Sequence, residues 1–233
     1  MKKSMSFLVV MLILFCITGS TWALPANLGD ILNNTAASQY TDTGAEAVVL
    51  TDTDGYNDDA TVFLLLELAG YAGTNRVGIY GFTYDADGNV VLGNMLQVFA
   101  GVDSQYDSVT LAFDLASGTV TNNSTHMVAS IGSTFGFYLS TQDDYTFYTH
   151  SSLNLDDFDH TLLFDTSDNT VGRLLGSDVV IAFEDLFGGG DGDYNDMVIG
   201  VTDVAPAPVP EPTTLILLGS GLLGLAGFRR KKS

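Results

Sequence analysis

The sequence predicts an all-β domain, a two-sheet β-sandwich of jelly-roll type, between an N-terminal signal peptide and a C-terminal hydrophobic anchor helix. Short segments rich in β-branched and aromatic residues recur along the chain, and turns rich in Gly, Asn, Asp and Ser separate them. Apolar and polar residues alternate in 109–113 and 135–139, as is typical of strands with one buried face. Many short strands without intervening helices favour two packed antiparallel sheets.

The expected strands follow from these segments in chain order: 47–50, 61–68, 77–84, 95–100, 109–114, 128–131, 135–140, 145–150, 161–164, 179–186 and 197–201. The segment 61–69 is also long enough to form a helix. Before the first strand, the apolar spacing in 27–39 predicts a short amphipathic helix through Leu28, Ile31 and Leu32.

The N-terminus has the order of a secretory signal peptide. Lys2 and Lys3 precede an apolar run over 7–17, and small residues follow it up to Ala23. We therefore expect residues 1–23 to be cleaved after Ala23. An uncleaved anchor is the alternative, but the run is shorter than the roughly 20 apolar residues of a membrane span.

The C-terminus predicts a membrane anchor. A Pro-rich linker over 204–209 separates the domain, residues 24–203, from an apolar, glycine-dotted segment that we expect to form a transmembrane helix over 213–228. The basic cluster 229–232 follows and would stay in the cytoplasm. The domain would thus be held outside the inner membrane.

Charge restricts the partners of the part between the two ends. Residues 24–209 contain 27 acidic side chains and only Arg76 and Arg173 as basic ones, a net charge of −25. Such a charge excludes nucleic acid and anionic lipid surfaces as partners. Bound divalent cations would relieve the self-repulsion, and an acidic surface without metal is the alternative.

The segment 179–201 has the composition of a calcium site, because oxygen-bearing side chains lie among glycines between two apolar strands. Calcium takes about six to eight oxygen ligands, and glycines allow the sharp turns that bring them together. The sequence therefore predicts calcium as a cofactor, against the alternative of a purely turn-forming role. The candidate ligands are Glu184, Asp185, Asp191, Asp193, Asn195 and Asp196.

The spacing within this segment limits how the metal would be held. Asp191, Asp193 and Asn195 have the spacing that opens an EF-hand loop, but Asp196 stands where that loop needs Gly, so this is no EF-hand. The remaining ligand would come from Glu184 or Asp185. Because these are adjacent, only one of the two can face the loop from a regular strand.

A second acidic segment repeats the same plan and supplies weaker candidate ligands. Like the first, it is a Tyr-Asn-Asp segment that enters an apolar strand. If the two strands were neighbours that run the same way from one edge, their loops could share a composite cation site. Two unrelated turns are the alternative. The weaker candidates are Asp52, Asp54, Asn57 and Asp58.

The last residues resemble the bacterial PEP-CTERM sorting signal over 210–233. The resemblance rests on Pro210, Glu211 and Pro212, the hydrophobic segment, and a terminal basic cluster that begins with Arg229 and Arg230. It implies a Gram-negative host in which an exosortase-type membrane protease recognises Pro-Glu-Pro and removes the tail. The protein would then pass to the cell surface or to an extracellular matrix of polysaccharide.

Residues 130–203 resemble the domain of unknown function 4114. The resemblance rests on 135–139, on 154–164, and above all on 183–186 with the acidic segment 191–196. It implies a β-rich, calcium-binding surface module and no established enzymatic activity. We therefore expect an exported, surface- or matrix-associated protein that is not an enzyme.

Two other functions are weighed against this one. A glycoside hydrolase needs two carboxylates about 5–9.5 Å apart across a sugar, and the sequence offers no supported pair. The three histidines lack zinc-ligand spacing, and Asp159-His160 is interpreted as a surface pair. A carbohydrate-binding, lectin-like module is the stronger alternative, because aromatic residues cluster in one short span: Tyr138, Tyr145, Phe147, Tyr148 and Phe158.

Overall fold

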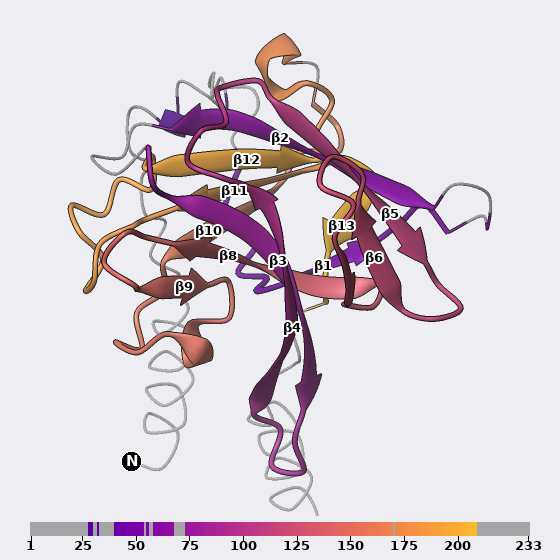
Figure 1. The fold of residues 1–233 in the computed structure, drawn as a ribbon. Coiled ribbons are helices and arrows are strands. Elements are labelled where there is room, and N and C mark those ends of the chain that lie inside the picture. The colour runs from indigo at the N-terminus through magenta and orange to yellow at the C-terminus, as the bar shows by residue number, and fades with distance from the viewer. Residues whose placement is uncertain are drawn as a thin grey trace, which may run out of the picture.

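The computed structural model describes residues 28–29, 32, 40–53, 55, 58–67, 73–169 and 171–208, and within them the chain forms two antiparallel β-sheets (Figure 1). The first sheet contains β1 (Val48–Leu50), β3 (Arg76–Tyr84), β4 (Val90–Phe99), β8 (Thr134–Ser140), β9 (Thr146–Tyr148) and β13 (Val204–Pro206). Its order is β13-β1-β8-β3-β4, and β9 pairs with β8.

The second sheet contains the strands that carry the acidic segment. They are β2 (Asp59–Glu67), β5 (Ser108–Asp114), β6 (Thr119–Asn122), β7 (Val128–Ser130), β10 (Thr161–Asp165), β11 (Val179–Phe183) and β12 (Met197–Val201). They follow the order β10-β11-β12-β2-β5-β6-β7. Two single-turn 3₁₀-helices, η1 (Ser151–Leu153) and η2 (Gly172–Leu174), interrupt the connections.

A continuous hydrophobic core lies between the two sheets. Alternate residues of each strand point into it, such as Val179, Ile181 and Phe183 of β11 against Phe135 and Phe137 of β8. Full burial of one such side chain contributes about 1.5–3 kcal/mol. This core confirms the predicted all-β, two-sheet sandwich.

The strands β11 and β12 are buried on both faces. Their other set of alternate side chains, including Val180 and Val198, forms a second hydrophobic cluster on the outer face of the second sheet. Leu174 of η2 and Leu28 cover that cluster. The continuous apolar character of these strands in the sequence thus reflects two covered faces.

The strands β3 and β4 of the first sheet form a hairpin whose far half extends beyond the sandwich (Figure 1). Its near half packs in the core through Val77, Ile79 and Leu96, whereas the first half of β4 is largely exposed. The expected strand 95–100 covers only the buried half, because apolar alternation marks only residues that meet the core.

Every expected strand has a counterpart in the structure, although several strand boundaries differ and two strands were not expected. The segment 61–69, for which a helix was the alternative, is strand β2. The strands β6 and β13 were not expected; β6 has only four residues, three of them polar, and β13 contains proline. With thirteen strands in the described residues, the sandwich is larger than an eight-stranded jelly roll.

The expected linker over 204–209 begins inside the domain. Val204–Pro206 forms β13, whose register on β1 pairs Leu50 with Val204 and Val48 with Pro206. Val204 is also part of the core between the sheets. Proline usually argues against a strand, so the Pro-rich composition did not predict β13. Proline is nevertheless tolerated at a sheet edge, which is where β13 lies.

The predicted signal peptide over 1–23 and the predicted sorting signal over 210–233, with its helix over 213–228, lie outside the described residues. Of the predicted helix over 27–39, only Leu28, Gly29 and Leu32 are described; they have helical conformation, and both leucines are buried. Within the described part of the chain, none of the helices could reach across a bilayer.

Candidate metal centre

The acidic segment is the connection between two neighbouring antiparallel strands. β11 ends at Phe183, earlier than the expected Leu186, so Glu184 and Asp185 begin the connection, and β12 starts at Met197. We call residues 184–196 the acidic loop. Its glycines carry the reversal of the chain: Gly188, Gly189, Gly190 and Gly192 have φ angles of 78°, 82°, 47° and 70°.

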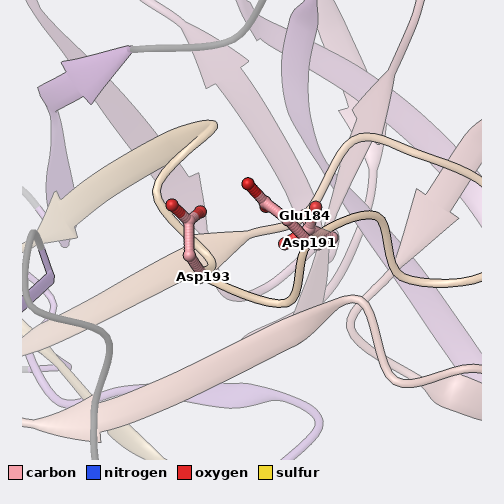
Figure 2. Close-up of side chains that lie close together, drawn as sticks. All are labelled: Glu184, Asp191 and Asp193. Carbon is pink, nitrogen blue, oxygen red and sulfur yellow. The ribbon is translucent and has the colours of Figure 1, made fainter.

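Three carboxylates of this loop converge. Each of Glu184, Asp191 and Asp193 offers one carboxylate oxygen, and these three oxygens lie within 4.8 Å of one another. Figure 2 shows Glu184 at the end of β11, and Asp191 and Asp193 on the loop that returns beside it. Three like charges at this separation repel one another unless a proton or a cation lies between them.

Glu184 is the buried member of the group. The residue is 1% exposed, and its Oε2 accepts a hydrogen bond of 3.2 Å from the backbone N–H of Tyr194. Its Oε1 has no hydrogen-bond partner in the described part of the chain. A Cβ atom on Gly190 would lie 2.1 Å from that oxygen, so the loop encloses Oε1 closely and only glycine fits there.

The pKa shifts reflect the same crowding. Burial raises the pKa of Glu184, and the charges of Asp191 and Asp193 raise it further against the opposing hydrogen bond from Tyr194. Burial, with the charges of Asp185 and Glu184, also raises the pKa of Asp196. The acidic loop is therefore poised to bind positive charge, either as protons or as a metal ion.

The other three predicted ligands have different contacts. Asp185 turns away from the three carboxylates, and its Oδ2 accepts a 2.9 Å hydrogen bond from Asn75 Nδ2. The backbone N–H of Asp185 donates to Asp196 Oδ2 at 2.9 Å. Asn195 donates to Asp193 through its backbone N–H and its Nδ2. These residues orient the loop and the carboxylates beside it.

A buried histidine immediately before β10, the strand that pairs with β11, contacts the loop. His160 Nδ1 lies 3.0 Å from the carbonyl oxygen of Glu184, and His160 Nε2 lies 3.0 Å from Asp156 Oδ2. These two contacts fix the orientation of the imidazole ring between Asp156 and the acidic loop. Asp156 also accepts from the backbone N–H of Gly188 at 2.7 Å.

The interpretation of Asp159-His160 as a surface pair is therefore wrong. His160 is fully buried, its ring stacks on Phe147 at 3.7 Å between centroids, and its partner is Asp156. The i,i+4 spacing of Asp156 and His160 is visible in the sequence, but only the fold brings Glu184 to the same ring. Asn75 had no sequence signal at all, because it meets Asp185 across 110 residues.

The composite site with the second acidic segment does not form. β2 and β12 are neighbours, but they run antiparallel, with Glu67 opposite Met197 and Val62 opposite Val201. The two acidic segments each precede their strand and so lie at opposite ends of the sheet. Asp58 instead accepts a hydrogen bond of 2.8 Å from the backbone N–H of Gly55. Asp52 lies at the same end of the sheet, since its charge acts on Asp59 at the start of β2. Asp54 and Asn57 are outside the described residues.

The five clustered aromatic residues separate into core and surface. Tyr138 and Phe147 are buried, and Tyr148 and Phe158 are half-buried. Only Tyr145 is exposed, with 38% of its surface accessible, and it contacts the exposed Phe187 of the acidic loop. The expected platform is thus reduced to one of its members plus a residue that was not predicted.

Comparison with known families agrees with the two resemblances. Residues 121–203 match the family model described as "Domain of unknown function (DUF4114)", and residues 208–231 match the PEP-CTERM protein-sorting motif. The first match begins earlier than the expected residue 130, and it includes β7 and the acidic loop. No curated protein and no solved structure was found to match the chain.

The sorting motif defines the class of protein. It contains Pro210, Glu211, Pro212, Arg229 and Arg230, and it belongs to exported proteins that an exosortase-type system processes. The chain is therefore an exported protein with a sorting motif after a β-sandwich domain, and its route leads to the cell surface or the extracellular space.

Proposed function

We propose that the acidic loop binds calcium and that the protein is a non-enzymatic, calcium-stabilised module of the surface or extracellular matrix. The observation that carries the proposal is Glu184: a buried carboxylate with one unpartnered oxygen, enclosed by Gly190, that faces Asp191 and Asp193. An oxygen-only donor set of this charge suits a hard divalent cation. Ca²⁺ would replace the protons that the crowded carboxylates otherwise take up.

We further propose that the signal peptide is cleaved and that the C-terminal helix holds the protein transiently in the inner membrane of a Gram-negative cell. An exosortase-type protease would then release the domain toward surface polysaccharide. Support comes from the sorting motif at 208–231. The proposal gives these carboxylates a metal-binding role and no catalytic one.

A calcium titration tests the metal site. With the full chain in detergent, Ca²⁺ at about 100 times its Kd adds about 2.7 kcal/mol, so we expect the melting temperature to rise by about 5–10 °C. Glu184→Gln and Asp193→Asn should abolish most of this rise, because each removes a charge from the group. Differential scanning calorimetry in Ca²⁺ and in chelator measures it.

The matched control is Asp87→Asn, since Asp87 is an exposed residue of the β3–β4 hairpin, apart from the acidic loop. This variant should keep the full calcium response. Identical melting curves of the unmodified chain in Ca²⁺ and in chelator would contradict the proposal.

The second candidate function is carbohydrate binding. The observation that favours it is the exposed contact between Tyr145 and Phe187, because exposed aromatic rings fixed at a surface are suited to stack on sugars. A glycan array with the full chain tests this function, and the absence of any bound glycan would exclude it.

A further inference from the structure

A cleft opens beside Tyr145 at one end of the first sheet. It has a volume of about 570 Å³, and three segments line it: 73–76 at the start of β3, 100–102 after β4, and 140–146 between β8 and β9. Sites for small ligands have volumes of about 300–1,000 Å³. The cleft does not use the carboxylates of the acidic loop.

The floor of the cleft is a close contact between two turns. A Cβ atom on Gly101 would lie 2.5 Å from the backbone of Gly73, so glycine at position 101 lets the two chain segments touch. The cleft therefore rests on the ends of paired strands, β3 with β4 and β3 with β8. Such a support holds the lining residues in place before a ligand binds.

The polar groups of the cleft include both donors and acceptors that are not consumed by the fold. Gln142 is exposed, and its side-chain amide can both donate and accept a hydrogen bond. Arg76 is exposed, and no carboxylate of the described residues pairs with it. Asp144 completes the lining, and its negative charge balances the positive charge of Arg76. This mixture fits a ligand rich in hydroxyl groups, each of which both donates and accepts.

One wall of the cleft is aromatic and rigid. The Tyr145 ring stacks on the buried Phe147 with an interplanar angle of 15°, and it meets Phe187 with 5.3 Å between centroids. Phe187 is 53% exposed. An exposed ring that is anchored on the core presents apolar area at little cost in side-chain entropy, as the C–H face of a sugar requires.

We propose that this cleft binds a neutral hexose unit of a polysaccharide, with the ring of Tyr145 stacked on the sugar and with Arg76 and Gln142 hydrogen-bonded to its hydroxyls. This inference deepens the second candidate function and is independent of the calcium site. A neutral sugar is favoured over a uronate, because the charge of −25 over residues 24–209 repels a polyanion and Arg76 is balanced by Asp144.

The test is isothermal titration of the full chain, held in a detergent without a sugar headgroup. The probes are cellohexaose, maltohexaose and a mannan hexasaccharide, with a hexagalacturonate as the charged counterpart. We expect at least one neutral probe to bind and the hexagalacturonate to bind at least about tenfold more weakly. Tyr145→Ala and Arg76→Gln should each weaken the neutral probe about tenfold, since each removes a central contact.

Two variants separate a binding role from a structural one. Tyr145→Phe keeps the ring and should keep the affinity within about twofold. Tyr84→Ala removes a more exposed tyrosine from the far end of the β3–β4 hairpin and should change nothing. If both Tyr145→Ala and Arg76→Gln still bound the neutral glycan, the cleft would not be the binding site. Carbohydrate binding as a function would still be supported.

The remaining outcomes decide between the proposed cleft, its ligand class and the calcium site. Binding of no probe at all would overturn the cleft together with the second candidate function, and preference for the hexagalacturonate would overturn the neutral class. Each titration is repeated in Ca²⁺ and in chelator. A failed calcium response with intact glycan binding would count against the calcium site alone.

Discussion

At the scale of single residues, Glu184 combines burial, an unpartnered oxygen and two neighbouring carboxylates. An unpartnered buried polar group costs about 1–3 kcal/mol, and more when it is charged. The backbone N–H of Glu184 donates to the carbonyl oxygen of His160, the His160 ring contacts the carbonyl oxygen of Glu184, and Gly190 closes over its carboxylate. A cation at this point would turn the cost into a favourable interaction.

Gly190 is the residue whose replacement tests that enclosure. In Gly190→Ala the new methyl would meet Glu184 Oε1 and displace the carboxylate, and the positive φ adds strain of about 1–2 kcal/mol. We expect the calcium concentration for half-maximal stabilisation to rise about tenfold or more, as for other groups that orient metal ligands. Thermal melting over a calcium series measures it.

Gly88→Ala is the matched control, because Gly88 has a φ of 85° and open space where its Cβ would lie. It shares the backbone strain without the contact, so it should lower the melting temperature and leave the calcium dependence unchanged. An equal loss of calcium affinity in both variants would refute the role of Gly190.

At the scale of elements, the strand β13 ties the C-terminal end of the domain to the sandwich. It pairs with β1, which in turn pairs with β8 in the centre of the first sheet. Cleavage of the chain after residue 208 would therefore leave β13 paired in the sheet. The match to the sorting motif begins at residue 208, two residues after the end of β13. The domain and its sorting signal thus meet with little spacer between them.

Val204→Ala tests whether β13 is part of the domain. Val204 is 2% exposed within the core, so its truncation should lower the free energy of unfolding by about 1–3 kcal/mol. Chemical denaturation of the full chain measures the change. Ala205→Ser, at a half-buried neighbour in the same strand, should cost little. If 204–209 were only a spacer, neither variant would change the free energy of unfolding.

At the scale of the whole molecule, acidic groups dominate, and their burial couples stability to pH. Glu67 at the end of β2 has a buried Oε1 without a partner in the described residues, and burial together with the charge of Asp103 raises the pKa of Glu67 to about 7. The folded state therefore holds this proton more tightly than the unfolded chain, whose carboxyl titrates near 4.5. This contribution to stability is complete below the unfolded pKa and is lost as the pH rises toward 7.

The prediction is that, in chelator, Glu67→Gln flattens the fall in melting temperature between pH 5 and pH 8. Glutamine keeps the size of the side chain and removes its titration. Melting curves at several pH values compare the variant with the unmodified chain, and Asp87→Asn again supplies an exposed control. Parallel curves for Glu67→Gln and the unmodified chain would show that Glu67 does not carry the effect.

The success of the strand predictions has a local cause. Side chains alternate in direction along a strand, so residues that meet the core produce a pattern among close neighbours in the sequence. The alternation in 135–139 and the apolar run of 197–201 are such patterns. β6 and β13 were missed for the same reason, since a short polar strand and a proline-bearing edge strand carry too little pattern.

The candidate site was predictable only in part. Glu184, Asp191 and Asp193 lie within one connection of the chain, so their proximity follows from the hairpin of β11 and β12. The contact of Asp185 with Asn75 joins two connections, one after β11 of the second sheet and one before β3 of the first. The shared site with Asp52 and Asp58 failed because strand direction is a property of the whole sheet.

The sequence by itself determined the sandwich class, the sorting motif and the concentration of acid groups in the acidic loop, because each depends on residues close together in the chain. Only the tertiary structure decided that Glu184 is the enclosed carboxylate, that His160 braces it, and that Tyr145 stands at a cleft. The physical reason is that burial and sheet order arise when distant strands pack, and no short segment of the chain contains that information.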